Sequence, residues 1–245
     1  MSIRQKIAVI LAELIGTVVL ATSVYAMVGR TTFPLFAGIA AGLTLGLLVH
    51  TVGSVSGAHV NPAVTLALWS VRKIKTLKAV LYIAVQMLGG FAAWKLINYF
   101  MGTELQAIAG EKFEWRVLIA EVIGAFIFAF GIASAVYQKY EGAKLAFTVG
   151  ASLTIGILVA SLGSNGVLNP AVAVGIQSWD WAYATGPLVG AVLGMNVYAL
   201  IFNDDLTIKS PNSNPVSASL KSTTTKVAAK SKSATKTAKK TTKKR

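Results

Sequence analysis

Two copies of the triplet Asn-Pro-Ala are the most distinctive chemical feature of this sequence. The copies are Asn61, Pro62 and Ala63, and Asn169, Pro170 and Ala171. Each asparagine follows a stretch rich in glycine, serine and asparagine and precedes a short apolar run. Asparagine is a favoured helix N-cap, and proline fits the first helical position because its missing N–H would have no partner there. The triplets therefore predict two helix starts, each presenting an amide that can donate hydrogen bonds.

Other reactive groups are scarce. The chain has no cysteine and two histidines, so disulfides, metal sites and cofactors are not expected, and an enzyme lacks the material for a nucleophile and base. Glu13 and Glu121 are ionisable groups inside apolar runs, a position that suggests function such as a proton relay. His59 lies two residues before Asn61, with no cluster of metal ligands beside it.

Long apolar segments must position these groups. Apolar residues make up 54% of the chain, charged residues make up 13%, and the mean hydropathy is +0.64. A segment that spans a bilayer needs about 20 apolar residues. Six segments meet this length, at about 7–28, 34–53, 77–98, 117–137, 144–162 and 182–202. Two shorter pieces, at 62–70 and 170–178, are predicted to be half-helices that start inside the membrane.

The two halves of the chain repeat each other. "AELIGTVVLA" at 12–21 resembles "AEVIGAFIFA" at 120–129, and the same shift along the chain carries Glu13 onto Glu121 and Asn61 onto Asn169. Each half contains three spans, an odd number, so the second half must enter the membrane from the opposite face. In inverted repeats, paired interrupted segments mark the permeation site near the midplane. Irregular backbone is tolerated there only where protein buries it or a water-filled cavity borders it.

Basic residues predict the orientation and the ends of the domain. The region 1–202 is expected to form the channel domain, with one repeat at about 7–98 and the other at about 117–202. Lys and Arg cluster on the side that holds both termini, so both ends are expected to be cytoplasmic. The Lys-rich tail, 203–245, lacks apolar periodicity and is expected to be disordered. The tail either stays solvated or binds anionic lipids, and nucleic-acid binding is disfavoured because it has no aromatic residues for base stacking.

These motifs resemble the aquaporin family, also called the major intrinsic proteins. The two triplets, "SGAHVNPAVT", the repeated "AE.IG" and the pair "YIAVQMLGG" and "YATGPLVGA" carry the resemblance over about 7–202. It implies an all-α membrane protein of six tilted transmembrane helices and two half-helices, one pore in each subunit, a homotetramer, and a place in the plasma membrane. It also implies that Glu13 and Glu121 hold the half-helix loops, and that His59 braces a loop or gates the pore.

The selectivity filter departs from the family pattern. Water-selective members carry arginine directly after the second triplet, where this chain has Val172. Spacing from the triplets places the other filter positions at Ala41, Ile157 and Gly166, so the filter is predicted to be apolar. Glycerol-type members carry an aspartate where this chain has Ala173. The small filter residues favour larger solutes, whereas narrow apolar constrictions can dewet and close, and proton exclusion is expected to be weaker than in members with the arginine.

The predicted function is a passive channel for water, small neutral solutes or both. One alternative is a facilitator of glycerol, urea, ammonia or peroxide with little selectivity for water. A coupled transporter would need a carboxylate in the pathway and alternating access. A non-conducting membrane protein is the remaining alternative, and it would show no flux of any solute.

Overall fold

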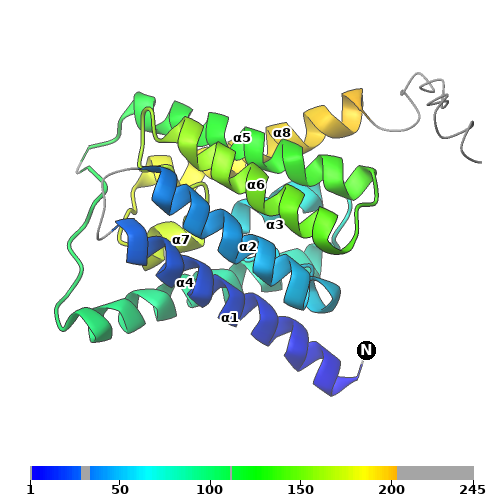
Figure 1. Cartoon of the computed structure of the whole chain (residues 1–245), viewed down its shortest axis with the longest axis horizontal. Coiled ribbons are helices and arrows are strands. Elements are labelled where there is room, and N and C mark those ends of the chain that lie inside the picture. The colour runs from blue at the N-terminus through cyan, green and yellow to red at the C-terminus, as the bar shows by residue number, and fades with distance from the viewer. Residues whose placement is uncertain (1, 29–33, 111, 203–245) are drawn as a thin grey trace, which may run out of the picture. The chain divides into compact units, whose positions relative to one another are not determined.

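Eight α-helices build the part of the chain that the structure, a computed structural model, describes: residues 2–28, 34–110 and 112–202. They are α1 (Ile3–Val28), α2 (Pro34–Ser56), α3 (Pro62–Ser70), α4 (Thr76–Met101), α5 (Trp115–Tyr137), α6 (Gly142–Ala160), α7 (Pro170–Gly175) and α8 (Trp181–Ile201). Six of them are long and apolar enough to cross a membrane, which confirms the predicted all-α membrane fold (Figure 1). The predicted basic tail lies outside the described residues.

The ends of several helices differ from the predicted ranges. Helix α1 begins at Ile3 instead of residue 7, because charged residues such as Arg4 and Lys6 end an apolar run without ending a helix. Helix α7 ends at Gly175 instead of residue 178, and Gln177 takes a left-handed conformation with φ of 60°. The second half-helix is therefore shorter than the first.

The helices pack in a pattern that repeats between the two halves. Helix α1 packs on α2 and α4, and α5 packs on α6 and α8, while α2 and α6 join the halves. Each half-helix also packs on a long helix of the opposite half, α3 on α8 and α7 on α4. Both half-helices lie within the bundle (Figure 1). This exchange brings the start of each half-helix into the interior.

Glycines allow the closest helix contacts. Gly42 of α2 and Gly150 of α6 occupy corresponding positions of the internal repeat, and a Cβ on either would overlap the backbone of the other. A Cβ on Gly190 of α8 would overlap the carbonyl oxygen of Val122 in α5. Small residues at such positions bring helix backbones together in lipid, where dispersion and close packing drive association.

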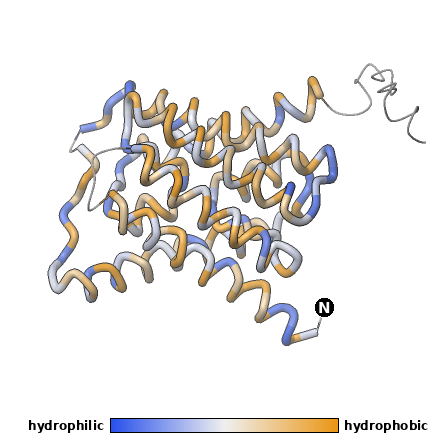
Figure 2. The backbone as a smooth tube through the Cα atoms, viewed as in Figure 1, coloured by the Kyte–Doolittle hydropathy of each residue, from blue (hydrophilic) through white to orange (hydrophobic). Residues whose placement is uncertain are grey.

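The outer face of the bundle is apolar. Leu43, Leu47 and Phe147 are large apolar residues that are more than half exposed, and apolar residues follow every helix in Figure 2. Such a surface is unfavourable in water and is expected of helices that contact lipid chains.

A candidate pore between two half-helices

The two asparagines cap the half-helices and bind each other's loops. The Oδ1 atom of Asn61 accepts a hydrogen bond from the N–H of Ala63 at 2.8 Å, and Oδ1 of Asn169 accepts one from Ala171 at 3.0 Å. The amide nitrogen of Asn61 donates to the carbonyl oxygen of Leu168 at 2.9 Å. The amide nitrogen of Asn169 donates to the carbonyl oxygen of Val60, also at 2.9 Å. The two half-helix tips therefore meet through a reciprocal pair of hydrogen bonds.

The residue before each asparagine has an unusual backbone. Val60 and Leu168 have positive φ values of 42° and 54°, and both are fully buried. Left-handed backbone is uncommon outside glycine and is a marked exception for a β-branched residue such as Val60. Such conformations cost roughly 1–3 kcal/mol each and persist only where the surroundings enforce them.

A buried glutamate supports the first loop. The Oε1 atom of Glu13 in α1 accepts the N–H of His59 at 3.0 Å, and Oε2 accepts the N–H of Val60 at 2.7 Å. Oε2 also accepts a hydrogen bond from the amide of Gln86 at 2.8 Å. These contacts pair two N–H groups that would otherwise be buried without an acceptor, and they fix the left-handed turn at Val60.

A second glutamate repeats this arrangement in the other half. The Oε1 atom of Glu121 in α5 accepts the N–H of Val167 at 2.9 Å, and Oε2 accepts the N–H of Leu168 at 2.7 Å. Oε1 also accepts a hydrogen bond from the hydroxyl of Ser164 at 2.7 Å. Both carboxylates are fully buried and lie behind the loops, outside the lining of the cavity described next.

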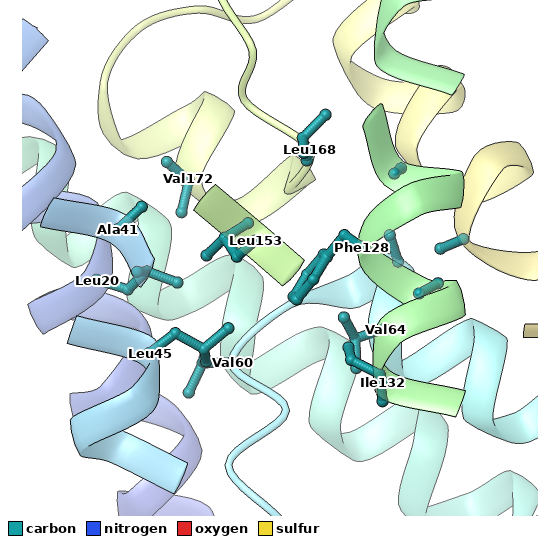
Figure 3. Packing of buried hydrophobic residues seen from close by; sticks show 14 of the residues in the cluster. Leu20, Ala41, Leu45, Val60, Val64, Phe128, Ile132, Leu153, Leu168 and Val172 are labelled. Atoms are coloured by element: carbon teal, nitrogen blue, oxygen red, sulfur yellow. The ribbon is translucent and has the colours of Figure 1, made fainter. Parts of the chain in front are cut away.

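A small cavity of about 20 Å³ lies where the half-helix tips meet. Its lining contains both asparagines, His59, and all four positions that the sequence places in the filter: Ala41, Ile157, Gly166 and Val172. Ala41 and Val172 point toward the same space, which Leu153 also approaches (Figure 3). A cavity needs a volume of about 10–15 Å³ to hold a water molecule. This cavity therefore admits about one water molecule at a time. The remaining triplet residues are buried at the helix starts.

The rest of the lining is apolar and was not predicted from the sequence. It includes Leu20, Leu45, Phe128 and Leu153, which form part of the buried apolar cluster (Figure 3). The internal repeat relates Leu20 to Phe128 and Leu45 to Leu153. These residues could have been found by applying the sequence shift of the internal repeat to the inward-facing positions of the spans. Among the described residues, the lining includes no carboxylate, lysine or arginine.

His59 connects the cavity to polar groups behind the first loop. Its Nδ1 atom lies 3.1 Å from the hydroxyl oxygen of Thr65, which is itself hydrogen-bonded to Gln86. The imidazole ring also packs edge-on against Tyr82, with ring centroids 5.1 Å apart. The ring is thus held by groups of α3 and α4 while it borders the cavity.

These features define a class of membrane protein: an inverted-repeat channel in which two half-helices enter from opposite faces and meet at a narrow neutral cavity. The sequence model of the major intrinsic protein family matches residues 2–198. The chain therefore belongs to the major intrinsic protein family. Members of this family are channels and not enzymes, so the chain is a passive channel for water, small solutes or both.

Individual relatives agree with this assignment. The probable aquaporin NIP7-1 of Arabidopsis thaliana is 30% identical over 235 residues, which cover 89% of this chain and 85% of the relative. Human aquaporin-4 is 31% identical over 182 residues, or 69% of this chain and 56% of that protein, so the chain spans little more than half its length. A solved structure, the aquaglyceroporin from Plasmodium falciparum, superimposes with a TM-score of 0.65 at 21% identity. That alignment covers 78% of this chain and 95% of the aquaglyceroporin chain, and it shows the shared fold.

Proposed function

We propose that the cavity at the half-helix tips is the narrowest part of a passive pathway for water and other small neutral solutes, one pathway in each subunit. The observation that carries this proposal is the composition of the lining. Two amide donors and one imidazole lie among apolar walls, and the cavity admits about one water molecule. The size favours the smallest candidate solutes, namely water, ammonia and hydrogen peroxide, over glycerol and urea.

The asparagine amides supply the hydrogen bonds in this proposal. An amide NH₂ group has two donors, and in each asparagine one donates to the opposite loop. The other is left to donate to the oxygen of a passing solute. Each amide also caps a helix start, which carries about half a positive charge. Two such ends at the same depth repel cations and orient water molecules in a way that opposes the passage of protons along them.

The apolar filter sets the proposed selectivity. Ala41, Ile157 and Val172 have no polar side-chain atoms, and Gly166 has no side chain, so a solute entering the filter loses hydrogen bonds to bulk water. Removing a strongly hydrated ion from water into such a passage costs far more free energy than removing a neutral molecule. Cation exclusion then depends more heavily on the helix starts, because Val172 stands where an arginine would add a fixed charge.

A filled cavity tests the pathway. We expect Ala41→Trp to reduce water flux in proteoliposomes to the level of protein-free vesicles, because the indole occupies the cavity. The matched control is Val55→Trp on the same helix, since Val55 is 44% exposed and lines neither this cavity nor the outer groove between α2 and α6. Stopped-flow measurements with water, ammonia, peroxide, urea and glycerol determine the solute range. Wild-type flux in Ala41→Trp would contradict the proposal.

A charged filter tests the consequence for protons. We expect Val172→Arg to reduce proton leak by about tenfold or more, since two unit charges about 4 Å apart interact by about 4 kcal/mol at an effective dielectric constant of about 20. The decay of a pH gradient across proteoliposome membranes measures the leak. A wild-type channel without detectable leak, unchanged by the substitution, would show that the helix starts suffice.

We also propose how the channel sits in the cell. Both termini are cytoplasmic and the membrane is the plasma membrane, with support from the basic residues at the edge where α1 begins. The subunits form a homotetramer, as the family suggests, and the outer groove between α2 and α6, about 410 Å³, is available for contact between copies. The basic tail binds anionic lipids of the cytoplasmic leaflet.

A further inference from the structure

A polar pocket lies at the edge of the bundle between the end of α3 and the start of α4. Its volume is about 670 Å³. The residues that line it include Trp69, Ser70, Arg72, Lys73, Lys75 and Thr76. It is separate from the cavity between the half-helices, and among the described residues none lines both. The three cationic side chains, Arg72, Lys73 and Lys75, make the pocket suited to bind an anion.

No described acidic side chain supplies that partner. Within the described residues, the ion pair present joins Arg116 to Glu114, at the opposite edge where α5 begins. Lys73 places its ammonium 4.6 Å from the ring centroid of Tyr137, whereas Arg72 and Lys75 are exposed and make no such contact with the described aromatic rings. Their positive charges are thus available to an anion in the pocket.

The surroundings of the pocket reinforce its positive charge. Lys73 contacts Tyr137 at the end of α5, so the connection from α5 to α6, which begins with Gln138 and Lys139, lies next to the pocket. Lys78 follows on α4, with its ammonium 4.8 Å from the ring centroid of Tyr82. Glu141 is the described acid in that connection, and it makes no ion pair in the described structure. Lys75 occupies the N-cap of α4 without a side-chain cap hydrogen bond, so the first N–H groups of this 26-residue helix remain free to bind an anion.

An apolar surface begins directly beside these charges. The indole nitrogen of Trp69 donates to the hydroxyl of Thr76 at 3.0 Å, which holds the ring at the rim of the pocket. Leu77 is 83% exposed and Val80 is 60% exposed, and they start the outward apolar stripe of α4. Because α4 is a membrane span, its first residues lie at headgroup depth, where tryptophan is also enriched.

We propose that this pocket binds an anionic phospholipid of the surrounding leaflet. Arg72, Lys75 and the start of α4 contact the phosphate, and Trp69 and Leu77 contact the upper part of an acyl chain. The combination identifies a lipid as the source of the phosphate, because a free phosphate would use the cations and leave the apolar rim without a partner. The site is part of the folded domain and is distinct from the basic tail.

Trp69 provides a local reporter for this site. The other tryptophans are Trp94, Trp115, Trp179 and Trp181, which lie past the middle of α4 or where α5 and α8 begin at the opposite edge. The full-length protein is placed in phosphatidylcholine vesicles that contain increasing amounts of phosphatidic acid with brominated acyl chains. The difference in fluorescence between the wild type and Trp69→Phe is the signal of Trp69. Quenching of this difference signal by the brominated lipid measures how much lipid lies at the pocket.

We expect phosphatidic acid to be preferred over phosphatidylcholine at Trp69 by roughly tenfold, since basic residues near the membrane surface attract anionic headgroups. Brominated phosphatidylglycerol, a diester with one charge, should give a smaller preference. The double variant Arg72→Gln, Lys75→Gln should lose the preference. The matched control Arg4→Gln, Lys6→Gln removes the same charge from the same edge and should keep it.

Three results would overturn the proposal. Equal loss of preference in the matched control would show a diffuse attraction to the whole edge. No preference at Trp69 in the wild type would show that no anionic lipid occupies the pocket. Thermal stabilisation by inorganic phosphate in phosphatidylcholine vesicles, lost in the double variant, would assign the pocket to free phosphate. All variants alter exposed side chains, so water flux should stay at the wild-type level and report correct folding.

Discussion

The loops before the two half-helices share one backbone design. In each, a residue with positive φ precedes an asparagine, and a fully buried glutamate accepts two consecutive N–H groups. Each asparagine then donates to the loop of the opposite half. This shared part makes no distinction between the two faces of the membrane. It accounts for the existence of two re-entrant loops, and any difference in chemistry must come from elsewhere.

The difference lies behind the loops. In the first half, a polar chain runs from His59 through Thr65 to Gln86. The internal repeat places Val167 opposite His59 and Ala173 opposite Thr65. The polar chain therefore has no counterpart at those two described positions of the second half, and the cavity receives an imidazole on one side only. The repeated residues hold the loops and bring one asparagine amide from each half to the cavity, and the residues that break the repeat add an imidazole on one side.

Removing the glutamates should have the largest effect and tests the shared part. We expect Glu13→Ala and Glu121→Ala each to lower the free energy of unfolding by roughly 2–6 kcal/mol, because each leaves two N–H groups without an acceptor at about 1–3 kcal/mol apiece. Unfolding in mixed micelles measures the change, and water flux should fall with it. The two losses should be similar, since both glutamates bind two N–H groups.

The control for this pair is Glu141→Ala, which removes an exposed carboxylate and should change stability by less than about 0.5 kcal/mol. A large loss for one glutamate and a near-neutral result for the other would break the comparison. It would mean that one loop keeps its left-handed residue through other contacts.

Much of this architecture could be predicted from the sequence. The repeat and the Asn-Pro starts were enough to infer six spans and two half-helices that meet, because these features depend on local helix signals and on an odd number of spans per half. Helix ends were less accurate. The apolar run that predicted the first span is bounded by the charged residue Lys6, whereas helix α1 itself begins earlier, at Ile3.

The walls of the cavity were harder to predict. Asn61 and Val172 lie in or directly after an Asn-Pro-Ala triplet, whereas Phe128 and Leu153 are apolar residues within apolar helices. Membrane helices have no polar face that would mark the side facing the interior. Periodicity fails here because lipid and protein interior select similar side chains. The pocket at Arg72 was also missed, since it depends on the distance between the end of α3 and the start of α4.

Making the two loops alike should have an intermediate effect. We expect His59→Val to reduce water flux severalfold, because the cavity loses a polar group. The free energy of unfolding should fall by about 1–2 kcal/mol, because the hydroxyl of Thr65 loses a partner. Stopped-flow shrinkage of proteoliposomes measures the flux. The reciprocal control, Val167→His, adds an imidazole to the other loop. Unchanged flux in His59→Val would show that the asparagine amides alone supply the polarity.

The tyrosines of the two halves offer the smallest and most specific test. The hydroxyl of Tyr82 donates to the carbonyl oxygen of Ser56 at 2.7 Å, whereas the hydroxyl of Tyr183 accepts the N–H of Asn165 at 2.9 Å. A buried N–H without an acceptor is rarer than an under-used carbonyl oxygen, which has two lone pairs. We therefore expect Tyr183→Phe to lower unfolding stability by about 1–2 kcal/mol and Tyr82→Phe by about 0.5–1 kcal/mol.

The matched control for the tyrosines is Tyr140→Phe, because the hydroxyl of Tyr140 donates to Gln138 at an exposed edge and its loss should be almost neutral. Equal losses for Tyr82→Phe and Tyr183→Phe would mean that the direction of the hydrogen bond does not matter. A larger loss for Tyr82→Phe would place more strain in the first loop than in the second. That result would be consistent with its β-branched Val60, which holds a positive φ where the second loop has Leu168.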